Sequence, residues 1–538
     1  MIEPTRPPSV DYRAAGLWED RTLGSVLAEA ADAGAELLAL VEGDTRLTYG
    51  ELLTRARAVA GGLSTLGADP GDVLTMQTPN WWESAVLHHA TMLAGLVVNP
   101  VVPIYRDAEV RFILGQARPK VVVVPHVFRK FDFVAMLERV LPDVSEPPRV
   151  VVVRAEGELP DGFVRFEELL EAQHAAPARV GADDVCLLLY TSGTTAEPKG
   201  VLHNHQTLVY ECRSIAELFS LGASDSIFMA SPLTHITGVL YALVLPVLIG
   251  GSVTLLNVWD PQTGADLIER ERCTFTIGAT PFLQGLTDVY AQRGERSSLR
   301  AFACGGADVP PDLVRRARSV LDCAVVRVYG SSEMPTLTCG HPDDPEHLAA
   351  ETDGRGIGPV EFRLLDEHQC VGELAVRGPE LFLGYLDPAL NDDAFLVDGF
   401  FATGDLASVD DDGAVTIRGR KKDIIIRGGE NISAKEVEDL LYENPHVREV
   451  AVVAMPDAAL GEKVCAFVVP DGGGEPDLPT LVAYLEEHRI AKQKFPERVE
   501  LVDELPKTAS GKVQKFVLRD RIRALVEQEA GHMKQVSR

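Results

Sequence analysis

The segment of residues 189–200 has the composition of an anion-binding loop. It reads Leu-Tyr-Thr-Ser-Gly-Thr-Thr-Ala-Glu-Pro-Lys-Gly and directly follows a short apolar run. Glycine lets backbone N–H groups approach an anion, hydroxyls donate hydrogen bonds, and the lysine adds a positive charge. An ordinary polar loop is the alternative, but the order of these residues favours phosphate binding, although the spacing is not that of a Walker P-loop. The expected anion contacts are Thr191, Ser192, Gly193, Thr194, Thr195 and Lys199.

Three side chains elsewhere have the chemistry to complete a nucleotide site. Glu333 follows a Gly-Ser-Ser turn and is a hard oxygen ligand, suited to Mg²⁺ that bridges the phosphates of ATP. Tyr329 offers a flat face for stacking, and Asp405 is an acceptor-only carboxylate able to take both ribose hydroxyls. Taken singly, they have structural alternatives: an exposed loop glutamate, a core tyrosine at a strand end, and the cap of a helix or turn.

The elements that must position these residues alternate between strand and helix. Short apolar runs bounded by turn or polar signals predict strands, and stretches of helical composition lie between them. This alternation implies parallel sheets covered on both faces, so the predicted fold class is α/β. The expected strands are residues 121–124, 150–153, 185–189, 253–255, 275–277 and 325–328, and the expected helices are residues 51–66, 82–94, 265–272 and 311–321.

One apolar segment, residues 236–259, has no charged residue and is nominally long enough to span a bilayer. Pro246 and the pair Gly250 and Gly251 interrupt it, and a β-rich run follows them. These breakers favour a buried helix, a turn and a buried strand over a membrane span.

A change of pattern near residue 420 predicts a second domain. Before it, Asp412 and Gly413 lie between β-like segments and mark a hairpin. We expect a large N-terminal domain of layered sheets and helices, with several subdomains, over residues 1–420, and a small mobile α+β lid over residues 421–538. The elements expected in the lid are strands at residues 450–454, 464–469 and 498–501 and helices around residues 434–442 and 479–488.

The charge of the chain limits its partners. Its 538 residues carry 51 basic and 80 acidic side chains, a formal net charge of −29. Such an acidic surface repels phosphate backbones and anionic lipid, which argues against general nucleic-acid or membrane-surface binding. A bound nucleotide therefore needs local cations, and the expected ones are Lys199, Arg420, Lys421, Lys422, Lys507 and Lys512.

The cysteines and the N-terminus favour a cytoplasmic protein. The eight cysteines are scattered, without a C-x-x-C pair or metal-ligand spacing, as is typical of reduced thiols in the cytosol. The first residues lack a basic region followed by an apolar stretch, so no signal peptide is predicted. Four histidines are interpreted as structural rather than as metal ligands: His88, His89, His203 and His205.

Taken together, the motifs resemble those of the adenylate-forming superfamily, which includes acyl- and aryl-CoA synthetases, peptide-synthetase adenylation domains and beetle luciferases. The resemblance runs over nearly the whole chain in the right order. Thr234 stands where the family usually has an aromatic residue, and Ser332 replaces a threonine but keeps the hydroxyl. The segments that carry the resemblance are residues 189–200, 232–238, 329–333, 403–405, 419–423 and 506–512.

The resemblance implies a role for each matching residue. Lys512 would steady the carboxylate and α-phosphate during adenylation, and Lys422 would be the hinge of the C-terminal domain. Lys512, Glu333 and His235 are the implied catalytic residues, with His235 bordering the carboxylate site. The other implied positions are Gly305, Gly306, Ala307, Tyr329, Gly330, Ser331, Ser332, Asp405 and Arg420 for ATP, Glu333 and Thr191 for the metal, Gly428 and Gly429 for coenzyme A, and Thr234, His235, Thr280 and Phe282 for the acyl pocket.

The resemblance also implies a two-step reaction with ATP, Mg²⁺ and coenzyme A. A carboxylic acid would first become an acyl-AMP with release of pyrophosphate, and the thiol of coenzyme A would then displace AMP. Rotation about Lys422 would separate the two steps. Segments at residues 81–82, 97–105 and 278–282 resemble short- and medium-chain fatty acyl-CoA synthetases and cyclohexanecarboxylate-CoA ligases.

Three alternatives stay open on the sequence alone. The acceptor is a carrier-protein thiol in some adenylating ligases, and a luciferase-like oxygenase shares the adenylation motifs. A non-catalytic nucleotide-binding regulator is disfavoured, because Lys512, Glu333 and Asp405 are all present. The expected partners are a small carboxylic acid, ATP and coenzyme A, with no nucleic acid and no transmembrane segment, and a homodimer is left open.

Overall fold

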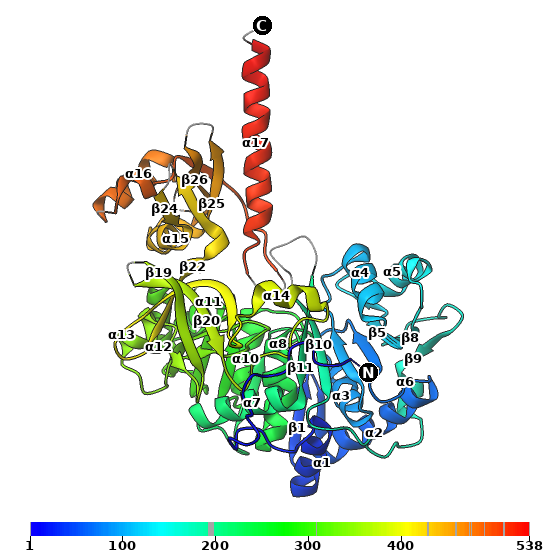
Figure 1. Ribbon diagram of the computed structural model, residues 1–538. Coiled ribbons are helices and arrows are strands. Elements are labelled where there is room, and N and C mark those ends of the chain that lie inside the picture. The colour runs from blue at the N-terminus through cyan, green and yellow to red at the C-terminus, as the bar shows by residue number, and fades with distance from the viewer. Residues whose placement is uncertain are drawn as a thin grey trace. The chain divides into compact units, whose positions relative to one another are not determined.

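The computed structural model describes residues 2–191, 198–307, 309–368, 370–427, 430–457, 460–472, 474, 476–488, 490–508 and 512–536 (Figure 1). By its internal contacts the chain divides into two compact units. The first comprises Met1–Glu361 and Arg377–Phe401, and the second comprises Phe362–Val376 and Ala402–Arg538. The expected domain boundary at residue 420 stays a prediction about which segments move together.

Parallel strands form the body of the larger sheet in the first unit. Its order is β18-β17-β16-β15-β14-β12-β13-β1-β2. The strands from β16 to β1 are parallel, and antiparallel strands lie at both edges. The strands are β1 (Leu38–Glu42), β2 (Thr45–Thr48), β12 (Ser226–Met229), β13 (Ser252–Leu255), β14 (Phe275–Gly278), β15 (Ala301–Gly305), β16 (Ala324–Tyr329), β17 (Thr338–Cys339) and β18 (Arg355–Gly356).

The second sheet of this unit has the order β11-β10-β4-β3-β5-β8-β9. Its strands are parallel except for the antiparallel pair β10 and β11. The strands are β3 (Val73–Met76), β4 (Val97–Pro100), β5 (Val121–Pro125), β8 (Arg149–Val153), β9 (Phe163–Arg165), β10 (Val185–Thr191) and β11 (Lys199–Asn204), and a separate ribbon pairs β6 (Val127–Phe128) with β7 (Phe131–Asp132).

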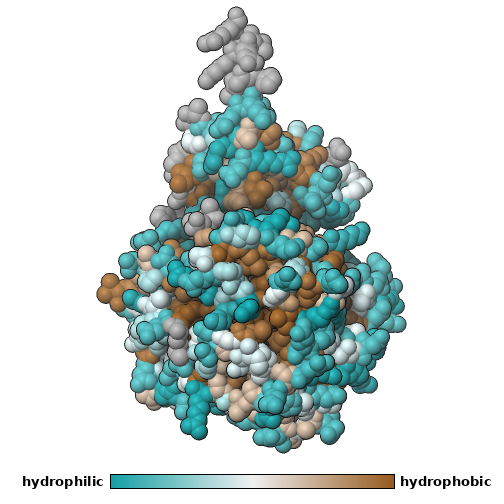
Figure 2. Space-filling view, turned by 90° about the vertical axis from the view of Figure 1, so that its right-hand side faces the viewer, coloured by the Kyte–Doolittle hydropathy of each residue, from teal (hydrophilic) through white to brown (hydrophobic). Residues whose placement is uncertain are grey.

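Helices cover these sheets, as the alternating pattern predicts. In β15, Ala301 and Ala303 join one buried cluster, while Phe302 and Cys304 join another, so both faces of the strand are covered. The parallel strands and the helices that alternate with them confirm the α/β fold class. On the surface, hydrophilic residues cover much of the face in Figure 2, and hydrophobic residues gather in its middle. The helices of this unit are α1 (Leu23–Gly34), α2 (Tyr49–Thr65), α3 (Trp82–Leu93), α4 (Asp107–Ala117), α5 (Phe133–Val140), α6 (Phe166–Leu170), α7 (His205–Leu218), α8 (Ile236–Gly238), α9 (Leu245–Ile249), α10 (Pro261–Glu271), α11 (Thr280–Arg293), α12 (Pro311–Leu321), α13 (Glu346–Glu351) and α14 (Asn391–Ala394).

The apolar segment at residues 236–259 folds as predicted. Helix α8 continues through a π-helical stretch, η2 (Val239–Val244), into α9. Gly250 ends the helix with a φ of +71°, and β13 follows. Within the described residues, none of the helices is long and apolar enough to cross a bilayer.

Local capping explains a difference from the predicted elements. Helix α10 begins at Pro261, four residues before the predicted start at residue 265, because the Asp260 side chain accepts a hydrogen bond from Thr263 N and caps the helix. Proline is well suited to the first helical position, since its missing N–H would have no partner there.

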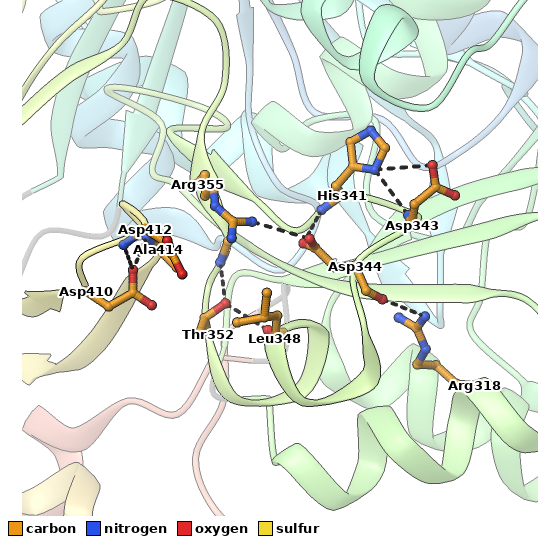
Figure 3. A network of polar contacts seen from close by, with 11 residues as sticks. Arg318, His341, Asp343, Asp344, Leu348, Thr352, Arg355, Asp410, Asp412 and Ala414 are labelled. Carbon is orange, nitrogen blue, oxygen red and sulfur yellow. Dashed lines mark hydrogen bonds and ion pairs between the residues drawn. The ribbon is translucent and has the colours of Figure 1, made fainter.

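Asp344, in the segment that follows β17, forms hydrogen bonds with three other residues. Its carboxylate accepts hydrogen bonds from Arg355 at 3.3 Å and from the backbone N–H of His341 at 2.8 Å, and its carbonyl accepts one from Arg318 at 3.2 Å (Figure 3). Because Arg355 lies on β18 and Arg318 on α12, this residue connects a helix to the edge of the sheet that flanks β16.

The second unit contains the predicted hairpin and α+β elements. Asp410 accepts hydrogen bonds from the N–H groups of Asp412 and Ala414, which closes the hairpin between β21 and β22 (Figure 3). The long C-terminal helix was not predicted. The elements are β19 (Glu361–His368), β20 (Val371–Arg377), β21 (Phe401–Val409), β22 (Val415–Arg420), β23 (Ile424–Arg427), β24 (Glu430–Ser433), α15 (Ala434–Tyr442), β25 (Val447–Asp457), β26 (Gly461–Pro470), α16 (Leu478–Glu487), β27 (Arg498–Leu501) and α17 (Lys515–Val536).

Candidate active site

Neighbouring parallel strands of the larger sheet place most of the predicted residues of the first unit at one edge. Strands β12, β14, β15 and β16 run in the same direction, so their carboxyl ends lie together. In open α/β sheets, this is the edge at which ligands bind. The predicted residues that follow or end these strands are Thr234 and His235 (β12), Thr280 and Phe282 (β14), Gly305, Gly306 and Ala307 (β15), and Tyr329, Gly330, Ser331, Ser332 and Glu333 (β16).

Of the residues predicted for the acyl pocket, Thr234 is buried, and His235, Thr280 and Phe282 are half-buried. Thr234 is 1% exposed, and its hydroxyl has no hydrogen-bond partner within the described residues. His235 precedes α8 and its Nδ1 accepts a hydrogen bond from Thr237 N at 3.3 Å. The ring of Phe282 packs edge-on against Trp259, with centroids 4.8 Å apart. The predicted pocket residues thus include an aromatic ring and polar groups that are able to hydrogen-bond a carboxylic acid.

The segment predicted to bind an anion lies between β10 and β11. Thr191 ends β10, Lys199 begins β11, and the two are cross-strand partners. Both flank the intervening loop because the hairpin pairs them directly. The predicted contacts Ser192, Gly193, Thr194 and Thr195 lie outside the described residues.

A tight turn after β16 presents Glu333. The Ser331 N–H donates to the carbonyl of Met334 at 2.9 Å, which folds the chain back on itself. The carbonyl of Glu333 accepts a hydrogen bond from Phe382 N at 2.8 Å. Its carboxylate accepts one from the Tyr385 hydroxyl at 2.8 Å. Both ends of the residue are therefore held, and the side chain is half-buried.

His203 supports the same turn from β11. Its Nε2 lies 2.8 Å from the carbonyl oxygen of Ser332, and its Nδ1 lies 3.1 Å from the Thr207 hydroxyl. Complete burial lowers the pKa of His203 to about 4. A neutral imidazole that donates to Ser332 suits a structural role beside the turn.

A substitution at Gly330 tests how tightly the turn after β16 is packed. A Cβ atom at Gly330 would lie 1.7 Å from the carbonyl oxygen of Pro335, so the turn would have to open. We expect Gly330→Ala to lower the free energy of unfolding by about 1–3 kcal/mol and to weaken nucleotide binding. The matched control is Gly115→Ala in α4, where a Cβ meets nothing within 4 Å and a gain of about 0.5–1 kcal/mol is expected. Urea unfolding gives both values, and equal stabilities for the two variants would contradict the packing argument.

In the second unit, two residues predicted for the nucleotide pair with each other. Asp405 and Arg420 are cross-strand partners on β21 and β22, and Arg420 Nε lies 3.1 Å from Asp405 Oδ1. Asp405 N donates a hydrogen bond to the Thr403 hydroxyl at 3.1 Å. The pairing holds a carboxylate and a guanidinium side by side, and their predicted roles at the nucleotide stay predictions.

Lys422 and Lys512 belong to a group of cations in the second unit. Burial, Arg420 and the nearby charges of Arg519 and Lys512 lower the pKa of Lys422 to about 8, against the opposing effect of Asp423. Lys512 N donates to the Thr508 hydroxyl at 3.1 Å, and Thr508 N donates to the Lys512 carbonyl at 2.8 Å. Gly428 and Gly429, predicted to line the thiol channel, lie outside the described residues.

Two cations expected to serve anionic ligands are engaged in ion pairs. Lys421 Nζ lies 2.7 Å from Glu373, and Lys507 Nζ lies 2.6 Å from Glu449. Charges that the chain neutralises itself contribute less to a nucleotide site. The sequence alone does not reveal these pairs, because the partners are distant along the chain.

The sequence prediction also missed Tyr385, which contacts both Glu333 and Lys199. Its hydroxyl donates to the carboxylate, and the Lys199 ammonium lies 5.0 Å from the centre of its ring. The available signal was an aromatic residue after a glycine, in the segment Leu-Gly-Tyr-Leu-Asp. That signal is weak by itself.

The fold and the site define a nucleotide-dependent enzyme of the α/β class, and comparison with known proteins agrees. The AMP-binding enzyme family matches residues 27–386, and the family of its C-terminal domain matches residues 436–512. The chain is 34% identical to a medium-chain fatty-acid–CoA ligase of Escherichia coli (strain K12), covering 96% of this chain and 93% of the relative. It is 35% identical to a salicylyl-CoA synthase / salicylate adenylyltransferase of Streptomyces sp, covering 95% and 96%.

Among solved structures, the chain is similar to ATP-bound MatB from Rhodopseudomonas palustris. The TM-score is 0.82 at 30% sequence identity, and the match covers 94% of this chain and 100% of that one. The chain therefore belongs to the AMP-binding enzyme family, within the adenylate-forming superfamily. It is a ligase of the acid–thiol type that activates an acid by adenylation.

Proposed function

We propose that the chain is an AMP-forming acyl-CoA synthetase. The observation that carries the proposal is that four strands of one parallel sheet, β12, β14, β15 and β16, bring predicted site residues together at their carboxyl ends. The chain is also 34% identical to a fatty-acid–CoA ligase over almost its whole length. The coarse activity, adenylation of an acid, follows from the family. The acceptor, the metal and the residue roles below are proposals.

In the first step, a carboxylate oxygen of the acid attacks the α-phosphorus of ATP. A bond forms between these atoms, the bond from the α-phosphorus to its bridging oxygen breaks, and pyrophosphate leaves. The hydroxyls of the 189–200 segment and Lys199 would hold the phosphates, Tyr329 would stack on the base beside Gly305, Gly306 and Ala307, and Lys512 would steady the charge that develops at the reacting centre.

Mg²⁺ fits the groups at this site. The Glu333 carboxylate and the Thr191 hydroxyl are hard oxygen donors, and the described residues hold no cluster of three acidic, histidine or cysteine ligands. Mg²⁺ is commonly held by one or two carboxylates together with substrate phosphates, so one protein carboxylate suffices. When bound, the ion would neutralise charge on the phosphates.

In the second step, the thiol of coenzyme A attacks the acyl carbon. The carbon–sulfur bond forms, the bond to the adenylate oxygen breaks, AMP leaves, and the thiol proton is lost to solvent. We propose that the C-terminal domain turns about Lys422 between the steps, which withdraws Lys512 and brings the segment of Gly428 and Gly429 to the thiol.

For the acid, we propose a short- or medium-chain fatty or alicyclic carboxylate, on the similarity to the medium-chain relative. A second candidate is a hydroxylated aromatic acid, with transfer to coenzyme A or to a carrier-protein thiol. The name of the Streptomyces relative and the buried Thr234 hydroxyl without a partner within the described residues favour this candidate, because a polar group on the acid would satisfy that hydroxyl.

A pyrophosphate-release screen tests the proposal. Fatty acids of graded length, cyclohexanecarboxylate, benzoate and salicylate are each offered with ATP and Mg²⁺, with and without coenzyme A. We expect release with one acid class and faster turnover with coenzyme A, because the thiol removes the bound adenylate. Adenylation that coenzyme A does not accelerate would point to a carrier-protein acceptor, and loss of the adenylate that depends on oxygen would point to an oxygenase.

A further inference from the structure

Tyr385 lies in a segment that runs beside β11. Leu202 N donates to the carbonyl of Gly384 at 3.2 Å, and Leu386 N donates to the carbonyl of Gly200 at 2.7 Å. Val201 and Tyr385 form an antiparallel bridge between these hydrogen bonds. The segment is thus paired with the strand that begins at the anion-binding loop.

The side chain of Tyr385 contacts both charged groups proposed to hold the phosphates. Its hydroxyl donates to Glu333 Oε1 at 2.8 Å. The Lys199 ammonium lies 5.0 Å from the centre of its ring, within the range of a cation–π interaction. One side chain therefore contacts both a cation and a carboxylate of the candidate site.

Tyr385 is itself held firmly. Its backbone N–H donates to Asn391 Oδ1 at 2.9 Å, and its carbonyl accepts from the Thr5 hydroxyl at 2.6 Å. Its ring packs edge-on against Phe382 at 4.9 Å, and the residue is 3% exposed. A side chain fixed at backbone and ring has little freedom left, so it is able to fix the groups that it touches.

The Tyr385 phenol is the donor in its contact with Glu333. A hydrogen bond to a carboxylate is stronger than a hydrogen bond between uncharged groups.

We propose that Tyr385 is a positioning residue that sets the orientation of Glu333 and the reach of Lys199, and so tunes the affinity of the site for Mg·ATP. The inference rests on the proposed adenylation function. The hydroxyl engages one carboxylate oxygen and restrains the rotation of the carboxylate, while the ring face attracts the lysine ammonium. Neither contact touches the acid or the thiol.

Tyr385→Phe tests the first contact, because it removes the hydroxyl and keeps the ring. We expect the Mg²⁺ concentration for half-maximal pyrophosphate release to rise about tenfold. Thioester formation from supplied acyl-adenylate and coenzyme A should stay within about twofold of the wild-type rate, since neither substrate carries the β- and γ-phosphates of ATP. Tyr385→Leu also removes the ring and should raise the KM for ATP further.

Tyr290→Phe is the matched control. Tyr290 is fully buried in α11, and its hydroxyl donates to Glu269 Oε1 at 2.6 Å. The variant loses the same kind of hydrogen bond away from the proposed phosphate site and should keep the wild-type dependence on Mg²⁺. The inference is overturned if Tyr385→Phe and Tyr290→Phe have the same Mg²⁺ dependence, or if Tyr385→Phe slows both half-reactions equally.

Calorimetric titration of ATP at several Mg²⁺ concentrations separates this inference from the proposed function. If the wild-type protein releases no pyrophosphate with any acid, the proposed function fails. The calorimetry then still decides the role of Tyr385: a shift of about tenfold in the Mg²⁺ dependence of ATP affinity in Tyr385→Phe alone supports it, and its absence contradicts it.

Discussion

Lys512→Ala is expected to lower the rate of acyl-adenylate formation by about 10²–10³-fold, and to leave thioester formation from supplied acyl-adenylate largely intact. The first half-reaction builds charge at the α-phosphate, and the ammonium of Lys512 is the group proposed to stabilise it. The second half-reaction needs no cation at this place once pyrophosphate has left. Rapid-quench measurements of each half-reaction give the two rates separately.

The backbone around Lys512 makes the result interpretable. Residues 507 and 513 form a bridge, and Lys512 and Thr508 exchange hydrogen bonds through backbone atoms and the threonine hydroxyl, so the alanine variant keeps the hairpin. Lys492→Ala is a suitable control, because this lysine is 83% exposed and belongs to the same unit. Equal slowing of both half-reactions in Lys512→Ala would contradict domain alternation.

The strand ends that carry most of the candidate residues were largely predictable because their signals are local. A strand followed by glycines, hydroxyls and a lysine predicts an anion loop wherever it occurs, and the hairpin of β10 and β11 carries that loop here. The bounds of α12, Pro311–Leu321, agree with the prediction because Pro311 begins the helix and the next two residues are good for a first turn. Short-range patterns of this kind survive any tertiary context.

Contacts between distant segments were not predictable. Tyr385 and Glu333 are 52 residues apart, and Lys421 and Glu373 are 48 apart, so each pair depends on a pairing of segments that a single sequence does not specify. Helix α17 was missed although its sequence has a signal: Leu518, Ile522, Leu525 and Val526 recur at helical spacing and pack in one cluster. The exposed Phe516 and Val517 next to Leu518 obscure this stripe in the sequence.

Buried histidines are expected to make the first unit lose stability as the pH falls from about 6.5 to about 4. Burial lowers the pKa of His89 and of His205 to about 4, and lowers that of His88 well below its usual value. His205 Nδ1 also accepts a hydrogen bond from Leu23 N at 3.2 Å, which protonation of that nitrogen would break. The folded chain therefore keeps these rings neutral where the unfolded chain would protonate them.

The direction follows from counting protons. Above the unfolded pKa of 6.5 both states are neutral, and the histidines do not affect the pH dependence. Below pH 6.5 the histidines bind protons in the unfolded state but not in the folded state. The free energy of unfolding therefore falls by up to about 1.4 kcal/mol per pH unit for each such histidine, until the pH reaches its folded pKa. Burial raises the pKa of Glu211 and of Glu380, which acts in the opposite direction: their stabilising effect is full below their unfolded pKa and is lost as the pH rises through the folded one.

His88→Leu isolates the histidine contribution from that of the carboxyls. His88 is 1% exposed, and neither ring nitrogen has a hydrogen-bond partner within the described residues, so leucine replaces it without stranding a polar group. We expect the variant to exceed the wild type in stability by about 2 kcal/mol more at pH 5 than at pH 7. Urea unfolding followed by tryptophan fluorescence is the measurement, because Trp18, Trp81, Trp82 and Trp259 all lie in the first unit.

The exposed His174 provides the control, since His174→Leu should leave the difference between pH 7 and pH 5 at its wild-type value. A His88→Leu variant with the wild-type dependence on pH would show that this ring gains a proton in the folded state, and that water reaches it between α3 and its neighbours. With the expected result, the acid limb of any activity profile below about pH 6 contains unfolding as well as the titration of catalytic groups. Rates measured there need correction for the fraction of folded protein before a loss of activity is assigned to a catalytic residue.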